Sequence, residues 1–233
     1  MPAHVFEDAD ALAAAAAERV VAAAGEAIAA RGRFDLGLSG GTTPAGLYRR
    51  LGGAWRERVD WGRVRVWFAD ERAVPPGDPQ SAFRLARETL IDPAGVPARN
   101  VHRMKGEYPD LAVAVAEYEA HLVAPLDLLV LGVGPDGHTA SLFPGSPLLA
   151  ERSRRVGLVE DSPKPPPRRI TVTPRVLDEA RVVLVLATGP EKAAAVARAL
   201  EGEAAPNEVP ARLVRGRDWY IDRAAGSGLR RAG

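Results

Sequence analysis

Apolar and polar positions alternate along the chain in blocks that predict strands and helices in turn. Residues 9–31 form an alanine-rich block with scattered charges, which predicts a long first helix. Nearly continuous apolar runs predict buried strands at residues 34–38, 64–69, 126–131, 155–159, 170–173 and 182–187. Further helices are predicted at residues 80–90, 111–123 and 189–200. Apolar strands that alternate with helices indicate an α/β fold, with a mainly parallel twisted sheet covered by helices on both faces.

The length of the chain suits one large domain, since it has 233 residues. We expect residues 1–225 to form a single α/β domain and residues 226–233 to be a loose C-terminal tail. The proline-rich segment 161–167 is expected to be an exposed loop. In the turn at 39–44, Thr43 is the predicted N-cap of a helix and Pro44 its first residue.

The composition narrows the range of functions. The chain carries 31 basic and 30 acidic residues, so its charge does not point to a nucleic acid or an anionic membrane as a partner. It has no cysteine, which excludes disulfides, thiolate metal sites and a cysteine nucleophile. Three charged residues interrupt the apolar stretch 11–30 and make it a poor membrane span, and the N-terminus lacks a secretory pattern. We expect a cytoplasmic protein that is a monomer or small homo-oligomer and acts on a small molecule.

Four polar clusters follow the ends of predicted strands. They are Ser39 to Thr43, Asp70 to Arg72, Gly132 to His138, and Thr188 to Lys192. In open α/β sheets, ligands bind beyond the carboxyl ends of the strands, which meet at one edge. The clusters are therefore expected to converge on a single site.

Two of these clusters suit the binding of an anion. Ser39, Gly40, Gly41 and Thr42 precede a predicted helix, so backbone N–H groups and the positive end of the helix dipole can face a phosphate. The alternative is an ordinary strand-to-helix turn. Arg72 can grip a phosphate through two parallel hydrogen bonds, although a surface salt-bridge group is the simpler interpretation of that cluster taken alone.

The other two clusters suggest a base and a further cation. His138 lies among glycines, and an imidazole with an ordinary pKa near ~6.5 can act as a base at neutral pH. Asp136 is placed to orient that imidazole, whereas the alternative is a structural histidine in a tight loop. Lys192 lies in the first turn of a helix, against the helix dipole, so it is expected to face an anion unless it is simply solvated.

Five segments of the chain resemble, in order, those of the glucosamine-6-phosphate isomerase/6-phosphogluconolactonase family, in particular its lactonases. They are LGLSGGTTPAGLYRRL, VWFADERAVPPGDPQSAFRLARETLI, DLLVLGVGPDGHTASLFPGS, KPPPRRITVTP and ATGPEK. The resemblance implies the α/β fold of the glucosamine-6-phosphate isomerases. It also implies hydrolysis of 6-phosphogluconolactone in the pentose phosphate pathway, with no metal and no organic cofactor.

The resemblance also assigns roles to residues. It implies that His138 activates water and that Asp136 is its partner or a substrate ligand. The 6-phosphate would be held by Arg72, Lys192, Gly40, Gly41 and Thr42, with Ser39 and Asp70 as further substrate contacts and Arg169 as an anion-binding residue on a mobile loop. Members often carry asparagine where this chain has Ala82, so any contact from that position is in question.

Two other functions remain open at this stage. A glucosamine-6-phosphate deaminase would need the glutamate that its relatives place five residues beyond the histidine, where this chain has Phe143. Asp70 can still shuttle a proton, so the difference weakens this reading without excluding it. A sugar-phosphate sensor would need an attached DNA-binding segment and a basic surface, for which the sequence gives no sign.

Overall fold

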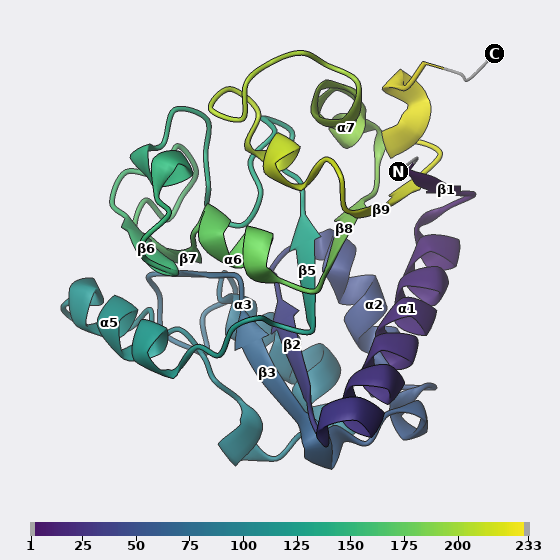
Figure 1. Cartoon of the computed structure of the whole chain (residues 1–233), viewed down its shortest axis with the longest axis vertical. Helices are drawn as coiled ribbons and strands as arrows, with labels where there is room; N and C mark the ends of the chain where they lie inside the picture. The colour runs from purple at the N-terminus through teal and green to yellow at the C-terminus, as the bar shows by residue number, and fades with distance from the viewer. Residues whose placement is uncertain (1–2, 231–233) are drawn as a thin grey trace.

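A parallel sheet forms the centre of the molecule (Figure 1). In the computed structural model, which describes residues 3–230, it has six strands in the order β1-β9-β8-β5-β2-β3, and every neighbouring pair is parallel. The strands are β1 (His4–Phe6), β2 (Phe34–Leu38), β3 (Val64–Phe68), β5 (Leu128–Gly132), β8 (Val182–Ala187) and β9 (Asp218–Asp222). The expected mainly parallel sheet is confirmed. The edge strand β1 and its neighbour β9 were not predicted.

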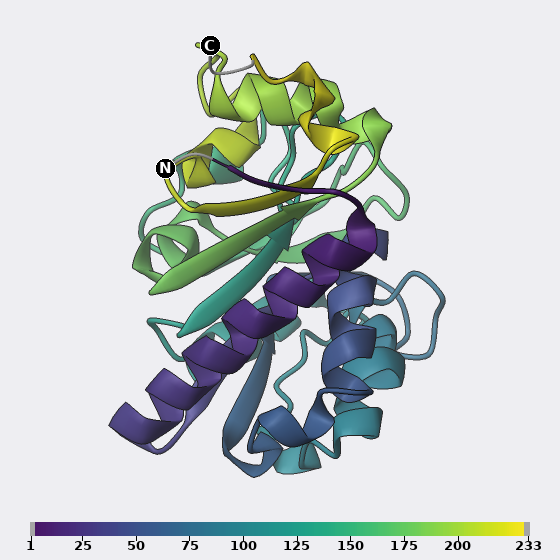
Figure 2. The same cartoon turned by 90° about the vertical axis from the view of Figure 1, so that its right-hand side faces the viewer.

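Helices cover both faces of this sheet. They are α1 (Ala9–Arg31), α2 (Thr42–Gly52), α3 (Ala82–Ala86), α4 (Asp92–Ala94), α5 (Leu111–His121), α6 (Pro174–Glu179) and α7 (Ala193–Leu200). Helices α1 and α2 pack against each other, and α1 contacts β2 and β9. Figure 2 shows α1 and α7 on opposite sides of the strands. The connection from β2 to β3 crosses the sheet in one direction, and those from β5 to β8 and from β8 to β9 cross it in the opposite direction. Because such crossovers are right-handed, opposite directions place the connecting helices on opposite faces of the sheet.

Single residues set the start and the end of helix α1. The Asp8 side chain accepts a hydrogen bond from Ala11 N at its start, and Gly32 ends it in the left-handed conformation with φ 73°. Its buried stripe recurs every three or four residues, at Leu12, Ala16, Val20, Ala23 and Ala27. Small side chains on that stripe let the helix lie close to the sheet.

A second, antiparallel sheet lies above the carboxyl end of the first. It has the order β4-β7-β6 and consists of β4 (Asp70–Arg72), β6 (Val156–Val159) and β7 (Arg169–Val172). The expected strands 155–159 and 170–173 therefore exist but do not join the parallel sheet. The chain leaves that sheet at Ala69, whose N–H bonds Leu38 O while its own carbonyl accepts from Val172 N. This step carries Asp70 and Arg72 over the end of β2.

Several predicted boundaries differ from the structure. Helix α2 begins at Thr42, so the expected N-cap at Thr43 is wrong. The chain turns into the helix at Gly41, whose φ of 109° suits glycine. The Thr43 hydroxyl contacts Thr188 Oγ1 at 2.9 Å. The predicted helix 80–90 is α3 followed by a π-helical turn, Arg87–Ile91. The 3-10 turn Ala225–Gly228 runs into the expected loose tail, residues 226–233, and contacts α7, whereas residues 231–233 lie outside the described residues.

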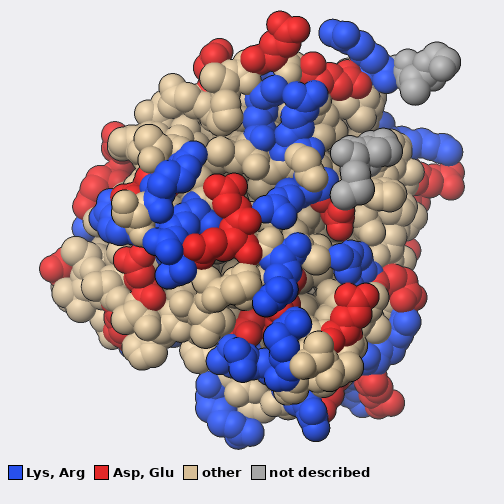
Figure 3. Space-filling model, viewed as in Figure 1, with Lys and Arg blue, Asp and Glu red and all other residues tan. Residues whose placement is uncertain are grey.

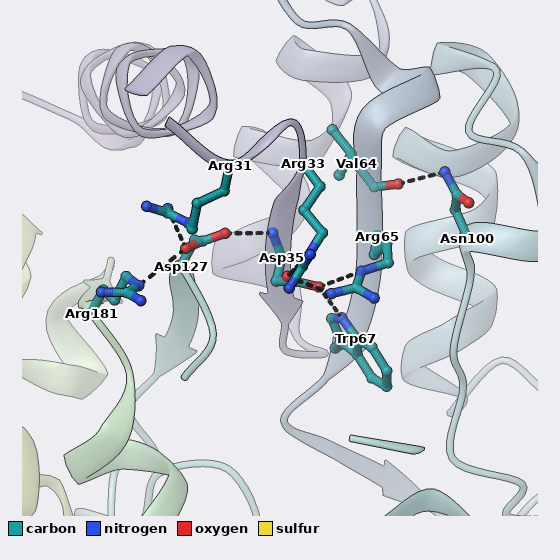
Figure 4. Close-up of polar contacts among 9 residues, drawn as sticks. All are labelled: Arg31, Arg33, Asp35, Val64, Arg65, Trp67, Asn100, Asp127 and Arg181. Atoms are coloured by element: carbon teal, nitrogen blue, oxygen red, sulfur yellow. Dashed lines mark hydrogen bonds and ion pairs between the residues drawn. The ribbon is translucent and has the colours of Figure 1, made fainter. Parts of the chain in front are cut away.

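Charged side chains join the amino ends of the parallel strands (Figure 4). Asp35 on β2 receives two hydrogen bonds of 2.7 Å from Arg65 and one of 3.0 Å from Trp67 Nε1. Asp127, just before β5, accepts from Arg31 Nη2 at 2.6 Å and from the Asp35 N–H at 2.9 Å. Both carboxylates are more than nine-tenths buried. They tie α1, β2, β3 and β5 together at the end of the sheet away from the predicted site.

The face of the molecule seen in Figure 3 carries acidic and basic side chains side by side. Ion pairs between partly exposed side chains include Arg155–Glu179 and Arg168–Glu160, each 2.8 Å. Within residues 3–230, none of the helices combines the length and the apolar character that crossing a membrane requires.

Candidate active site

A pocket of about 290 Å³ opens at the carboxyl ends of β2, β5 and β8. The chain runs from β2 toward β3 but from β5 toward β8, so the connections leave neighbouring strands in opposite directions and open a crevice between them. The pocket is lined by parts of all four clusters and by the loop before β7. The lining residues are Ser39, Gly40, Gly41, Thr42, Thr43, Pro44, Asp70, Arg72, Gly132, Val133, Gly134, Pro135, His138, Ala140, Lys164, Pro165, Arg169 and Lys192.

The turn after β2 brings two glycines, Gly40 and Gly41, to the pocket. A Cβ on Gly40 would come within 3.0 Å of the Ala82 Cβ, so glycine is needed for this close approach. Ala82 is buried beneath the turn and does not line the pocket. The Ser39 hydroxyl donates to Val130 O at 2.8 Å, so it ties the turn to β5. The positive end of α2 therefore faces the pocket at Gly41 and Thr42.

Successive side chains of strand β4 point to opposite faces of the strand. Asp70 and Arg72 line the pocket, and Glu71 points to the opposite face. There the buried Glu71 carboxylate accepts from Ala82 N at 2.7 Å and Phe83 N at 2.8 Å and caps α3. Burial raises the pKa of Glu71, although these hydrogen bonds oppose the shift. The expected surface salt-bridge alternative for this cluster therefore does not describe Arg72, which faces the pocket.

The glycine-rich loop after β5 holds a histidine–carboxylate pair. His138 Nδ1 lies 2.5 Å from Asp136 Oδ1, which leaves Nε2 as the other ring nitrogen. The pair fits because Gly134 has no side chain: a Cβ there would overlap the imidazole of His138. Phe143 is buried and packs against that imidazole, with ring centroids 4.7 Å apart. The loop thus fixes the orientation of His138 on two sides.

The same loop continues in a strained turn that reaches β4. Ala140 has φ 48°, a left-handed conformation that is unfavourable for a residue with a side chain. The next residue, Ser141, donates from its hydroxyl to Asp70 Oδ2 at 2.7 Å. Ser141 is fully buried, so this bond links the histidine loop to Asp70 of β4 from inside the protein.

Lys192 enters the pocket from the turn after β8. Gly189 makes that turn with φ 93°, and its N–H donates to the Asp222 carboxylate at 3.0 Å. Burial lowers the pKa of Lys192, and the nearby charge of Lys164 acts in the same direction. A partly desolvated ammonium group of this kind gains from an anionic ligand.

The loop 161–167 contributes a residue that the sequence interpretation did not assign to the site. Lys164 Nζ lies 3.2 Å from Asp136 Oδ1 and 3.3 Å from His138 Nδ1. Arg169, which was expected to bind an anion, lines the pocket and donates to the loop carbonyls of Lys164, Pro165 and Pro166, each at 3.1 Å. A signal for Lys164 was present, because it opens one of the five segments on which the resemblance depends.

The electrostatic balance of the pocket is positive. Arg72, Lys164, Arg169 and Lys192 line it together with one carboxylate, Asp70. Burial opposes ionisation of Asp136, but hydrogen bonds and charges from His138 and Lys164 hold its pKa well below the usual range of a carboxyl. Burial and the charge of Arg72 lower the pKa of Arg169. Such a pocket suits a ligand with more than one negative charge.

The structure brings together the residues expected from the sequence. Nine of the ten line the pocket, and Asp136 lies directly behind His138. The other histidines are elsewhere; His102, for example, stacks on Trp67 with ring centroids 4.0 Å apart. Across residues 3–230, no group of three or more His, Asp or Glu side chains is arranged to hold a metal ion.

Comparisons of sequence place the chain close to known lactonases. A protein-family model described as glucosamine-6-phosphate isomerases/6-phosphogluconolactonase matches residues 7–221. The chain is 41% identical over 242 residues to the 6-phosphogluconolactonase of Mycobacterium tuberculosis, covering 97% of each protein. It is 40% identical over 235 residues to the Homo sapiens 6-phosphogluconolactonase, covering 95% of this chain and 91% of the human one.

Comparisons of structure agree with those of sequence. The 6-phosphogluconolactonase of Trypanosoma brucei superposes with a TM-score of 0.84 and 27% identity, over 99% of both chains. A monomeric glucosamine-6-phosphate deaminase superposes equally well, with a TM-score of 0.84 over 98% of this chain and 100% of the deaminase, but at 22% identity. The second likeness concerns the fold alone.

Proposed function

This chain belongs to the family of glucosamine-6-phosphate isomerases and 6-phosphogluconolactonases, and from that premise we propose how its pocket carries out the lactonase reaction. The reaction is hydrolysis of 6-phospho-D-glucono-1,5-lactone to 6-phospho-D-gluconate, the second step of the oxidative pentose phosphate pathway. One observation carries the assignment of roles: the His138–Asp136 pair borders a pocket lined by four cationic side chains.

We assign His138 as the general base. Its Nδ1 faces Asp136, so Nε2 is the nitrogen that accepts a proton as water attacks the lactone carbonyl carbon. Asp136 orients the ring and stabilises the imidazolium that forms. The tetrahedral oxyanion then collapses, the bond between the carbonyl carbon and the ring oxygen breaks, and the imidazolium returns its proton to that oxygen. The products are the ring-opened acid and the regenerated histidine.

The glycine loop itself supplies few donors for the oxyanion. Gly134 N–H already donates to His138 O at 2.8 Å, and Gly137 N–H donates to Gly134 O at 2.9 Å. The negative charge that develops on the carbonyl oxygen is therefore assigned to the cationic lining of the pocket.

We assign the 6-phosphate to the turn after β2, to Arg72, whose Nη1 lies beside Gly40 of that turn, and to Lys192. Backbone N–H groups at Gly41 and Thr42, at the positive end of the eleven-residue helix α2, suit phosphate oxygens. Lys192, partly desolvated, reaches the same pocket from the turn after β8. Anchoring the phosphate fixes the carbonyl beside His138 and supplies binding energy to the reaction.

The deaminase alternative is disfavoured by the surroundings of His138. Moving a proton between carbons and opening an amino-sugar ring needs additional acid–base groups. The position that carries glutamate in that group is Phe143, whose ring packs on the imidazole. The expected cytoplasmic location and the monomeric or small oligomeric state remain predictions.

A direct assay tests the proposal. Freshly prepared 6-phosphogluconolactone should be hydrolysed by the purified protein well above its spontaneous rate, and glucosamine 6-phosphate should release no ammonia. Ammonia release at a rate comparable with lactone hydrolysis, or lactone hydrolysis no faster than in buffer, would contradict the assignment.

A further inference from the structure

We propose that Lys164, held in place by Arg169, is a positioning residue that keeps the Asp136–His138 pair ready to accept a proton. The inference rests on the lactonase function proposed above. It adds a third charged group to the pair and gives the loop before β7 a role in the reaction.

Lys164 contacts both members of the Asp136–His138 pair directly. Its ammonium group donates to Asp136 Oδ1 at 3.2 Å, which is the same oxygen that contacts His138 Nδ1 at 2.5 Å. The distance from Lys164 Nζ to His138 Nδ1 is 3.3 Å. One carboxylate oxygen is thus shared between an ammonium group and an imidazole.

Arg169 fixes the backbone that carries Lys164. Its guanidinium donates to three successive carbonyls of the loop, at Lys164, Pro165 and Pro166, and approaches Ser141 Oγ at 3.4 Å. Arg169 is buried, with 4% of its surface exposed. Ser162 closes the loop from the other side, since its hydroxyl donates to Lys164 O at 2.9 Å and accepts from Lys164 N–H. Lys164 is therefore held at the pair by a clamped loop.

The charge of Lys164 has a definite effect on proton transfer. An ammonium group beside an imidazole opposes protonation of the ring, and it also competes with the ring for the Asp136 carboxylate. Both effects favour the neutral imidazole, which is the form that acts as a base, over the imidazolium. Both also favour the step in which the imidazolium gives its proton to the departing ring oxygen.

Other charges face the same space, and they do not replace Lys164. Among the described residues, only Asp136 and Lys164 lie within hydrogen-bonding distance of the His138 imidazole. The other charged groups of the pocket reach it from β4, from β7 and from the turn after β8; they are Asp70, Arg72, Arg169 and Lys192.

The test is the pH dependence of kcat/KM in Lys164→Met, which keeps the length of the side chain and removes its charge. The acid limb of the profile should move to higher pH by roughly one unit. The same shift is expected with 6-phosphogluconolactone and with unphosphorylated glucono-1,5-lactone, because the effect acts on the base. The pH midpoint does not depend on how much of the sample is folded, so partial misfolding of the variant does not hide the result.

Two further variants complete the experiment. Lys164→Arg keeps the charge, so its acid limb should lie within about 0.3 pH units of the wild type. Arg168→Met removes a neighbouring cation that pairs with Glu160 on the outside of the loop, so it should leave the profile unchanged.

An acid limb that does not move in Lys164→Met would overturn the proposal. A loss confined to KM for the phosphorylated lactone would also overturn it, because it would make Lys164 a phosphate ligand. Neither result would affect the lactonase assignment, which fails only if the wild-type protein does not hydrolyse the lactone.

Discussion

The two ends of the parallel sheet use the same chemical groups in opposite ways. At the amino end, Asp35 and Asp127 are each contacted by two or more arginines, among them Arg65, Arg31 and Arg181. At the carboxyl end, Arg72 and Lys192 face a pocket and form no ion pair with any residue that the structure describes. Charges that satisfy one another bind the fold together, whereas cations left without a carboxylate are available to a ligand.

The largest effect is expected at the carboxyl end, for His138→Ala. Removal of the base should lower kcat by roughly 10²–10⁴-fold, the usual contribution of general acid–base catalysis. Thermal stability should change little by comparison, because the imidazole is at the border of a pocket. Initial rates, corrected for spontaneous lactone hydrolysis, measure the effect. A variant with wild-type kcat would remove His138 from the mechanism.

At the amino end, Asp35→Ala should act on stability instead of turnover. It leaves Trp67 Nε1 without an acceptor and Arg65 without its carboxylate. The free energy of unfolding should fall by about 2–4 kcal/mol, less than for a wholly buried pair because Arg65 reaches solvent. Urea unfolding measures this.

Asp35→Asn is the matched control for that change. It retains an acceptor for Trp67 and should be less destabilising than Asp35→Ala. If either variant lost activity per folded molecule while keeping its stability, the division between the two ends would be wrong.

Substitution of Lys192 and Arg72 should affect binding of the phosphorylated lactone more than the hydrolysis step. Lys192→Met and Arg72→Met should each raise KM for the phosphorylated lactone by roughly 10–100-fold, the value of a charge-assisted hydrogen bond. The effect on glucono-1,5-lactone should be much smaller for Lys192→Met, since that substrate has no phosphate. Equal losses on both substrates would show that Lys192 does not bind the phosphate.

A smaller effect is expected from the pH dependence of stability at Asp136. Its pKa is lowered in the folded state, so the folded protein favours the ionised form. The contribution to stability is therefore complete above the ordinary carboxyl pKa and is lost as pH falls below it. The difference in urea midpoint between wild type and Asp136→Asn should shrink between about pH 5 and pH 2. A difference that is constant over this range would contradict the assigned ion pairs.

No effect is expected from chelation. Asp136 is engaged by Lys164 and Asp35 by Arg65, and within residues 3–230 no group of three or more His, Asp or Glu side chains is arranged to hold a metal ion. Prolonged treatment with EDTA should leave lactonase activity unchanged. Activity that is lost on chelation and restored by one particular metal would overturn the metal-free mechanism.

Most residues of the candidate site could be predicted from the sequence, for a physical reason. Clusters that follow buried strands meet at one edge of a parallel sheet, so the sequence alone predicts that Ser39, Asp70, His138 and Lys192 lie together. The sequence predicted less about the loop that contains Lys164 and about the contacts of Arg169. A lysine among prolines looks like an exposed loop, and only the hydrogen bonds of Arg169 to the loop carbonyls show that this loop turns inward.

The amino acid sequence thus determined the alternating elements and the identity of the reactive groups, because these depend on local periodicity and on single residues. Only the tertiary structure decided which strands left the parallel sheet, since the step at Ala69 depends on hydrogen bonds to Leu38 and Val172. It likewise decided which charges are neutralised and which are free. The pairing of Asp35 with Arg65, 30 positions apart, and of Asp136 with Lys164, 28 positions apart, depends on distances that exist only when the chain is folded.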